Sequence, residues 1–435
     1  MTTPARPSFA GHVRAVAARG GLVVQPRMGF ADPQRMLAGL LATKHADATT
    51  AGTITLDSYT RVGDFAAVRA ALADGVDLNG YPIASLDPFI TLSVLDGVGH
   101  PGFPVQVRHG SALPSAVFDA MVGLGLDATE GGPASYCLPY SRVPLTRAVQ
   151  SWASCCERFA ELGELGFEPH LESFGGCMLG QLCPPSLLVA ITVLEGLFFR
   201  RHGLTSVSLS LAQQTHAGQD LEALHALHAL AAEHLSDVDW HVVLYAYMGV
   251  YPRSRRGALR LLGDAAALAV RGGAARLIVK TVAEAYRIPT VAENVEALEF
   301  AAGVAARTTV DLVPEDTGLL AEARALVDAV LELDADVGKA IVRAFAFGYL
   351  DVPYCLHADN MGRARSYLDD SGRLRWSSVG RMPIRADGGG ERGALSSADL
   401  LGALRVVERR YDEGEPDAFP DPGPDFHDRR IGNRA

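Results

Sequence analysis

At 435 residues, the chain is long enough to bury a large core and to hold one large domain or two ordinary ones. With 48% hydrophobic and 20% charged residues, its composition is that of a compact enzyme and excludes a disordered or fibrous protein. The net charge of −11 argues against nucleic acid as a partner, because phosphate binding needs a basic face.

Short β-rich runs alternate with longer amphipathic stretches over most of the chain. The strand candidates are residues 21–25, 53–56, 78–81, 105–107, 126–129, 170–174, 207–211, 241–245 and 277–280. Helices are predicted between them, for example over 64–73, 115–124, 145–162, 220–234 and 257–269. This alternation predicts an α/β protein with a parallel sheet, and the number of repeats favours a closed (β/α)8 TIM barrel. There is one candidate strand too many, and the pattern does not identify it.

The pattern predicts four regions in chain order. A helical lead over residues 1–20 precedes a TIM-barrel catalytic domain over 21–310. A helical and irregular extension over 311–385, helical over 314–347, is expected to pack on the barrel. Residues 386–435 are expected to form a flexible glycine-rich loop at 387–393, an amphipathic helix at 396–411 and an acidic tail rich in proline and glycine.

Three arginines and one glutamate follow the ends of predicted strands. Arg27 lies in QPRMG, Arg61 in SYTR, Arg108 in RHG and Glu130 in TEGG. Since barrel chemistry lies on the loops after the strands, these four side chains are expected to meet at one rim. Arginine forks bind carboxylates, and a glutamate kept charged there can hold an ammonium, so an amino-dicarboxylate site is predicted. The alternative is ordinary surface arginines and a solvent-facing or helix-capping glutamate.

Two further pairs have both a functional and a structural interpretation. Tyr136 and Tyr140, in SYCLPY, either point their hydroxyl groups at the same ligand or pack on the barrel top. Lys280 and Glu284 either hydrogen-bond a ribose or form an i,i+4 salt bridge worth roughly a few tenths of a kcal/mol.

The remaining signals concern metals, compartment and membranes. Six cysteines without framework spacing indicate reduced thiols in a cytoplasmic protein, and no metal or nucleotide motif is evident. The N-terminus lacks the apolar core of a secretory signal. The longest apolar run, residues 187–199, is interrupted by Thr192, Glu195 and Gly196, so no membrane span is predicted.

Several short motifs together resemble the catalytic, epsilon component of glutamate mutase, also called methylaspartate mutase. They occur in the order of that family over residues 20–360: QPRMG, TLDSYTR, LNGYP, QVRHG, TEGGPASYCLPY, LIVKTVAEA followed by RIPT, and AFAFGYLDVPY. The resemblance implies an isomerase, an adenosylcobalamin-dependent mutase built on a TIM barrel. Such an enzyme interconverts L-glutamate and (2S,3S)-3-methylaspartate by a radical carbon-skeleton rearrangement.

The resemblance also assigns roles to individual residues, with Glu130 as the catalytic one. The implied substrate-binding residues are Arg27, Arg61, Arg108, His109, Glu130, Tyr136 and Tyr140. The implied cofactor-binding residues are Gly29, Asn79, Pro139, Tyr251, Lys280, Glu284 and Ile288, with Lys280 and Glu284 on the adenosyl ribose.

The chain lacks the DxHxxG signature that supplies the lower cobalt ligand, because Asp96 and His100 have the wrong spacing. The resemblance therefore implies a separate small cobalamin-binding subunit that shares the adenosylcobalamin, with this chain as a homodimer within a heterotetramer. Two alternatives stay open: a mutase acting on another glutamate-like amino-dicarboxylate, and a non-catalytic barrel that scaffolds a cobalamin-binding partner.

Overall fold

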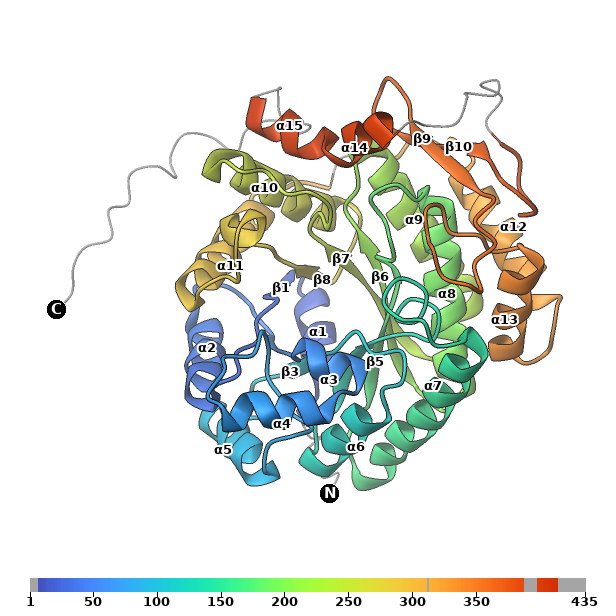
Figure 1. The fold of residues 1–435 in the computed structure, drawn as a ribbon. Helices are drawn as coiled ribbons and strands as arrows, with labels where there is room; N and C mark the ends of the chain where they lie inside the picture. Colours follow the sequence, from blue (N-terminus) through green and yellow to red (C-terminus); the bar gives the residue numbers. More distant parts are fainter. Residues whose placement is uncertain (1–6, 311–312, 387–396, 414–435) are drawn as a thin grey trace.

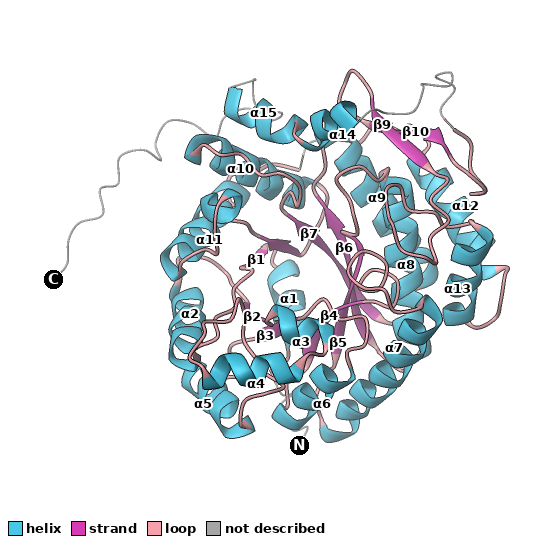
Figure 2. Ribbon diagram, in the orientation of Figure 1, coloured by secondary structure: helices cyan, strands magenta, loops and turns pink. Residues whose placement is uncertain are grey.

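A computed structural model describes residues 7–310, 313–386 and 397–413. Eight parallel strands form the sheet in the order β1-β8-β7-β6-β5-β4-β3-β2. Their bounds are β1 Val23–Gln25, β2 Gly52–Thr55, β3 Val105–Arg108, β4 Ala128–Gly131, β5 His170–Gly176, β6 Ser206–Ala212, β7 Asp239–Tyr245 and β8 Arg276–Ile278. A bridge between Val24 and Thr50 joins the two ends of the sheet. The predicted (β/α)8 barrel is confirmed, with its strands ringed by helices (Figures 1 and 2).

The ninth strand candidate, residues 78–81, lies outside the barrel. It contributes a single bridge, from Tyr81 to Leu56, in the connection after β2. Gly80 packs so closely on this connection that a Cβ atom would lie 2.5 Å from the backbone of Leu56. The strand-like pattern therefore reflects a buried loop segment that backs the end of β2.

Helices cover the outside of the barrel. Those of the barrel region are α2 Pro33–His45, α3 Ser58–Val62, α4 Phe65–Ala73, α5 Pro88–Val98, α6 Ser115–Leu124, α7 Leu145–Ala160, α8 Pro185–Arg201, α9 Ala217–His234, α10 Arg255–Arg271 and α11 Val291–Ala305, with 3-10 turns η1 Glu161–Leu165 and η2 Val282–Ala285. α8 is almost wholly buried, because α7, α9 and two later helices pack around it. Within the described residues, every helix is too short or too polar to cross a bilayer.

Helix α1, Phe9–Ala17, closes the N-terminal end of the barrel. Phe9, Val13 and Val16 pack against the first residues of the strands, including Val23 and Ala128. Inside the barrel, the Phe9 ring stacks on His170 with 5.5 Å between ring centroids. This end is filled by core side chains, which leaves the opposite end for a ligand.

The C-terminal extension packs against one side of the barrel. The predicted helical region over 314–347 is two helices, α12 Leu319–Leu331 and α13 Val337–Phe347, because Asp336 caps a new start. A hairpin follows that was not predicted, β9 Arg365–Leu368 and β10 Leu374–Ser378. Figure 1 shows α12, α13 and the hairpin lying outside α7, α8 and α9.

The helix predicted over 396–411 is also divided. It consists of α14 Ser397–Leu404 and α15 Val406–Glu413, and α15 lies on α10. The Tyr411 hydroxyl donates to Asp264 on α10, which fixes α15 against the barrel. The predicted loop at 387–393, and the tail beyond residue 413, lie outside the described residues.

Candidate active site at the mouth of the barrel

Arg108 and Glu130 form a buried ion pair at the C-terminal end of the strands. β3 and β4 are neighbours and pair at Val107 and Thr129, which places the next residues of both strands side by side. Arg108 Nη2 lies 2.9 Å from Glu130 Oε2, and the two residues are only 4% and 2% exposed. The neighbouring parallel strands thus bring two opposite charges together, as expected from the positions of Arg108 and Glu130 at the ends of predicted strands.

Two tyrosines complete the surroundings of Glu130. The Tyr136 hydroxyl donates to Glu130 Oε1, and the Tyr245 hydroxyl lies 2.5 Å from Oε2. Arg108 stacks over the Tyr245 ring, with its Cζ 5.0 Å from the ring centroid. Burial alone would lower the pKa of Arg108, but nearby Glu130 and the tyrosines raise it, so the guanidinium stays charged.

Three buried nitrogen atoms at the mouth have no hydrogen-bond partner among the described residues. They are Arg108 Nη1, Arg61 Nε and His109 Nε2. Buried donors are almost always paired in folded proteins, because an unpaired donor costs roughly 1–3 kcal/mol. Other buried polar atoms, such as Trp376 Nε1, are also unpaired, but these three nitrogen atoms lie together beside the Glu130 carboxylate. Donors and a carboxylate placed together suit a ligand that carries both anionic groups and a cation.

His109 is neutral, and its tautomer follows from its neighbours. Its Nδ1 accepts a hydrogen bond from the Ser111 amide at 3.0 Å, which leaves the ring proton on Nε2 as a donor. Burial lowers the pKa of His109 to about 3, although the nearby Glu130 backbone carbonyl opposes the shift, and the charge of Arg61 adds to the lowering. The ring stacks on Trp152 with 5.7 Å between centroids and is held in place from behind.

Arg61 and Arg27 approach the mouth from the loops after β2 and β1. Arg61 lies on α3, and its aliphatic stem passes over Gly110, where a Cβ atom would lie 3.2 Å from Arg61 Cδ. The charge of Arg27 opposes the burial that raises the pKa of Tyr140, and it adds to the burial that lowers the pKa of Lys280. The Arg27 charge therefore lies close enough to act on both Tyr140, after β4, and Lys280, after β8.

A cavity of about 910 Å³ opens beside the buried pair. Its wall includes Arg61, Pro139 and Tyr140, and on the far side residues 354–358 of the extension. Tyr140 is 41% exposed and meets Tyr136 edge-on, with 6.1 Å between centroids. Arg108 and Glu130 do not line this cavity themselves, but Arg61 does, and Tyr140 in its wall meets Tyr136, which donates to Glu130.

Lys280, Glu284 and Tyr251 form a second group at the same end of the barrel. Lys280 follows β8 and Glu284 lies in η2, with Nζ 3.4 Å from Oε2. Lys280 Nζ also lies 5.2 Å from the Tyr251 ring centroid, and the buried Tyr251 hydroxyl has no partner among the described residues. Ile288, further along this loop, is exposed.

Gly29 and Asn79 have local structural explanations. A Cβ atom on Gly29 would lie 2.1 Å from the Thr55 carbonyl oxygen, so only glycine allows the β1 loop to cross β2 there. The side chain of the exposed Asn79 accepts a hydrogen bond from the Ser58 amide at 2.9 Å, at the start of α3. Both residues support the loops that carry Arg27 and Arg61, and neither contacts the buried pair.

Comparisons with known proteins agree with this arrangement. Residues 3–389 match the family described as "Methylaspartate mutase E chain (MutE)". The chain belongs to this family. It is 30% identical to the glutamate mutase epsilon subunit of Desulfitobacterium hafniense, covering 96% of this chain and 87% of that protein. It is 34% identical to the glutamate mutase epsilon subunit of Halobacterium salinarum, covering 76% and 71%.

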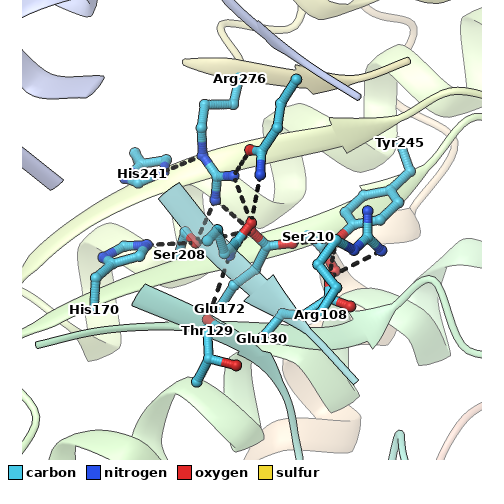
Figure 3. A network of polar contacts seen from close by, with 12 residues as sticks. Arg108, Thr129, Glu130, His170, Glu172, Ser208, Ser210, His241, Tyr245 and Arg276 are labelled. Carbon is cyan, nitrogen blue, oxygen red and sulfur yellow. Dashed lines mark hydrogen bonds and ion pairs between the residues drawn. The ribbon is translucent and has the colours of Figure 1, made fainter. Parts of the chain in front are cut away.

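The methylaspartate mutase E chain family is one of mutase subunits, and the matched region of this member includes the barrel and the extension. Sequence reasoning missed a buried network below the mouth, in which Glu172 on β5 contacts both the Tyr245 hydroxyl and Arg276. Figure 3 shows the mouth pair and this network joined through Tyr245. Part of the signal was present in the sequence, since Arg276 is a lone charge in the apolar run AARLIV, whereas Glu172 lies in the polar run HLES.

Proposed function

We propose that this chain is the catalytic subunit of an adenosylcobalamin-dependent mutase that interconverts L-glutamate and (2S,3S)-3-methylaspartate. The observation that carries the proposal is the buried Arg108–Glu130 pair with orphan donors around it. Membership of the methylaspartate mutase E chain family supports the reaction, and relatives are named glutamate mutase epsilon subunit.

In this proposal, the side chains at the mouth bind and orient the substrate. Arg108 Nη1, Arg61 Nε and His109 Nε2 donate to the two carboxylates, and Glu130 accepts from the ammonium group. Tyr136 fixes the Glu130 carboxylate, while Arg27 and Tyr140 close the outer side. Burial excludes water from this region, which protects reactive intermediates.

Lys280, Glu284 and Tyr251 fit the adenosyl ribose of the cofactor. A lysine–glutamate pair offers a donor and an acceptor to two hydroxyl groups, and the orphan Tyr251 hydroxyl offers another partner. By resemblance, Gly29, Asn79, Pro139 and Ile288 line the rest of the cofactor site. When bound, adenosylcobalamin supplies the radical that abstracts hydrogen from the substrate.

We further propose a small DxHxxG subunit as partner, with this chain as a homodimer within a heterotetramer. The sequence has no DxHxxG motif. Around the mouth, Leu356 is 96% exposed, and Val62 and Ile288 are also exposed apolar residues, which suits a docking face. All six cysteines are free and buried, which suits a cytoplasmic protein.

The test is reconstitution. The purified chain should show neither mutase activity nor cobalamin binding until a DxHxxG subunit is added. In the assembled enzyme, Glu130→Gln should lower turnover of L-glutamate by roughly two orders of magnitude or more, since it removes the charge opposite the ammonium. The exposed Glu164→Gln variant is the matched control and should be silent. Tight adenosylcobalamin binding by the chain alone, or full activity of Glu130→Gln, would contradict the proposal.

A further inference from the structure

Glu195 is a buried carboxylate without a cation. It lies on α8, where residues 185–199 are all buried, and it is 0% exposed. No ion pair joins it to any described residue, and the titratable side chain that faces it from the neighbouring α7 is the Cys156 thiol. An unpaired buried charge is costly, so its presence in an apolar helix calls for an explanation.

The Glu195 carboxylate instead binds the turn between Glu130 and Tyr136. Its Oε1 accepts from the amides of Ala134 at 3.1 Å and Ser135 at 2.8 Å. Its Oε2 accepts from the hydroxyl groups of Ser135 at 2.9 Å and Ser173 at 2.8 Å. Two backbone donors and one side-chain donor of one turn thus converge on one carboxylate.

The turn has the form of a helix start that lacks its own cap. Tyr136 N donates to Gly132 O at 3.1 Å and Leu138 N to Ala134 O at 3.0 Å, as in a helix. Pro133 occupies the first helical position, where a backbone N–H would have no acceptor within the helix. The amides of Ala134 and Ser135 come next and also lack an acceptor within the helix. Glu195 supplies from another helix the oxygen that a capping side chain normally supplies.

The close approach also explains Gly132. A Cβ atom there would lie 2.1 Å from the Glu195 carboxyl group. Glu195 can therefore reach the turn only because residue 132 is glycine. The turn begins two residues after Glu130.

We propose that Glu195 is a positioning residue, which holds the Gly132–Ser135 turn so that Tyr136 meets Glu130 at the mouth of the barrel. This inference rests on the proposed amino-dicarboxylate site. The hydrogen bond from Tyr136 to Glu130 spans the turn from end to end. Displacement of the turn therefore moves the hydroxyl group that orients the proposed ammonium acceptor.

The effect of the Glu195 carboxylate on folding stability depends on pH. Burial raises the pKa of Glu195 to about 7, although the hydrogen bonds from Ser135 and Ser173 oppose the shift. Because the folded-state pKa is raised, this group's contribution to stability falls as the pH rises from about 4.5 to 7. Above about pH 7, Glu195 is a carboxylate and accepts hydrogen bonds from all four donors. We therefore expect the charged form to hold the turn in place while lowering the stability of the fold.

The test compares Glu195→Gln with Thr192→Val, one turn earlier on the same helix. Thr192 donates to Ser173 Oγ at 3.0 Å but does not contact the turn. Glu195→Gln keeps the shape but directs an amide NH2 group at Ser135 and Ser173. Hydrogen exchange of a peptide covering residues 130–140 in the full chain reports the turn without any ligand. Calorimetric titration of the assembled enzyme with L-glutamate reports the site.

For Glu195→Gln, we expect faster exchange in this peptide and about tenfold weaker L-glutamate binding, the scale of a hydrogen bond to a charged group. Ser135→Ala, which removes one donor and keeps the carboxylate, should lie between it and wild type. Thr192→Val should leave both measurements unchanged. Wild-type protection should fall below pH 7, after correction for intrinsic exchange, and Glu195→Gln should lack this dependence.

The inference is overturned if Glu195→Gln exchanges and binds as wild type, or if Thr192→Val changes both measurements equally. Failure of the wild-type enzyme to bind any amino-dicarboxylate would instead contradict the proposed function. The exchange measurement would still decide whether Glu195 holds the turn.

Discussion

The barrel contains two buried arginine–glutamate pairs that differ in one respect. In the interior, Arg276 donates to His241 through Nε at 3.1 Å, to Gln25 through Nη1 at 2.6 Å and to Glu172 through Nη2 (Figure 3). At the mouth, Arg108 uses Nη2 on Glu130 but leaves Nη1 without a partner among the described residues. The interior pair is saturated by the protein itself, whereas the mouth pair has donors left for a ligand. The number of donors that the protein itself pairs therefore distinguishes a charge pair that supports the fold from one that is available to a ligand.

The largest expected effect is on stability, at the interior pair. Arg276→Met should lower the free energy of unfolding by about 3–5 kcal/mol, because it leaves Glu172 buried without its cation. Arg14→Met is the control: Arg14 pairs with Glu168 and Asp239 near the surface and should cost less than about 1 kcal/mol. Urea unfolding measures both. Equal costs would remove the distinction between saturated interior and surface pairs.

Arg108→Lys should act on binding instead. Lysine keeps the charge but loses the fork, so the affinity of the assembled enzyme for L-glutamate should fall by about 1–3 kcal/mol. Arg61→Lys should behave similarly, while Arg69→Lys on the exposed face of α4 should be silent. Calorimetric titration gives the affinities. A loss of stability in Arg108→Lys as large as that in Arg276→Met would mark both pairs as structural.

The neutral histidine at the mouth should give a pH dependence. Since burial lowers the pKa of His109 to about 3, the unfolded chain binds a proton below pH 6.5 that the folded chain does not. Stability from this group is present above pH 6.5 and is lost at about 1.4 kcal/mol per pH unit below it. His109→Gln should show a shallower decline than wild type in urea unfolding between pH 7 and 5.5. An unchanged slope would mean that His109 is protonated in the folded chain.

The smallest effect on the fold is expected at the Lys280–Glu284 pair. Lys280→Ala should lower the free energy of unfolding by less than Arg276→Met does, because the Glu284 side chain is 18% exposed and can be solvated without the lysine. The same variant should lose the cofactor-dependent radical signal in electron paramagnetic resonance of the assembled enzyme with L-glutamate. L-glutamate binding should survive. A radical signal of wild-type strength would remove Lys280 from the proposed cofactor site.

The sequence predicted the mouth better than the interior. Arg108 and Glu130 could be placed together because the ends of neighbouring parallel strands meet at one rim. Glu172 and Arg276 come from strands on different sides of the barrel, and their meeting depends on the barrel's closure. Glu195 interrupts an apolar run, which was visible, but its contact with the 132–135 turn requires the packing of α8 on β5.

Some predicted helix and strand boundaries were wrong because they too depend on contacts between distant parts of the chain. Residues 78–81 have a strand-like composition, yet only Tyr81 bridges to the barrel, because the loop is used to back β2. The position of α15 depends on its packing against α10, where Tyr411 donates to Asp264, and a contact between residues so far apart in the chain has no local pattern. The hairpin β9–β10 has short strands with few buried positions, so its periodicity is weak.

We propose above that the unpaired donors at the mouth bind an amino-dicarboxylate. The most direct measurement is the shift in thermal unfolding midpoint of the assembled enzyme on adding saturating L-glutamate, in wild type, Arg108→Lys and Arg14→Lys. Because a ligand that binds only the folded state stabilises it, wild type and Arg14→Lys should show equal shifts to higher temperature, and Arg108→Lys a much smaller one. No shift in wild type, or an undiminished shift in Arg108→Lys, would contradict the account.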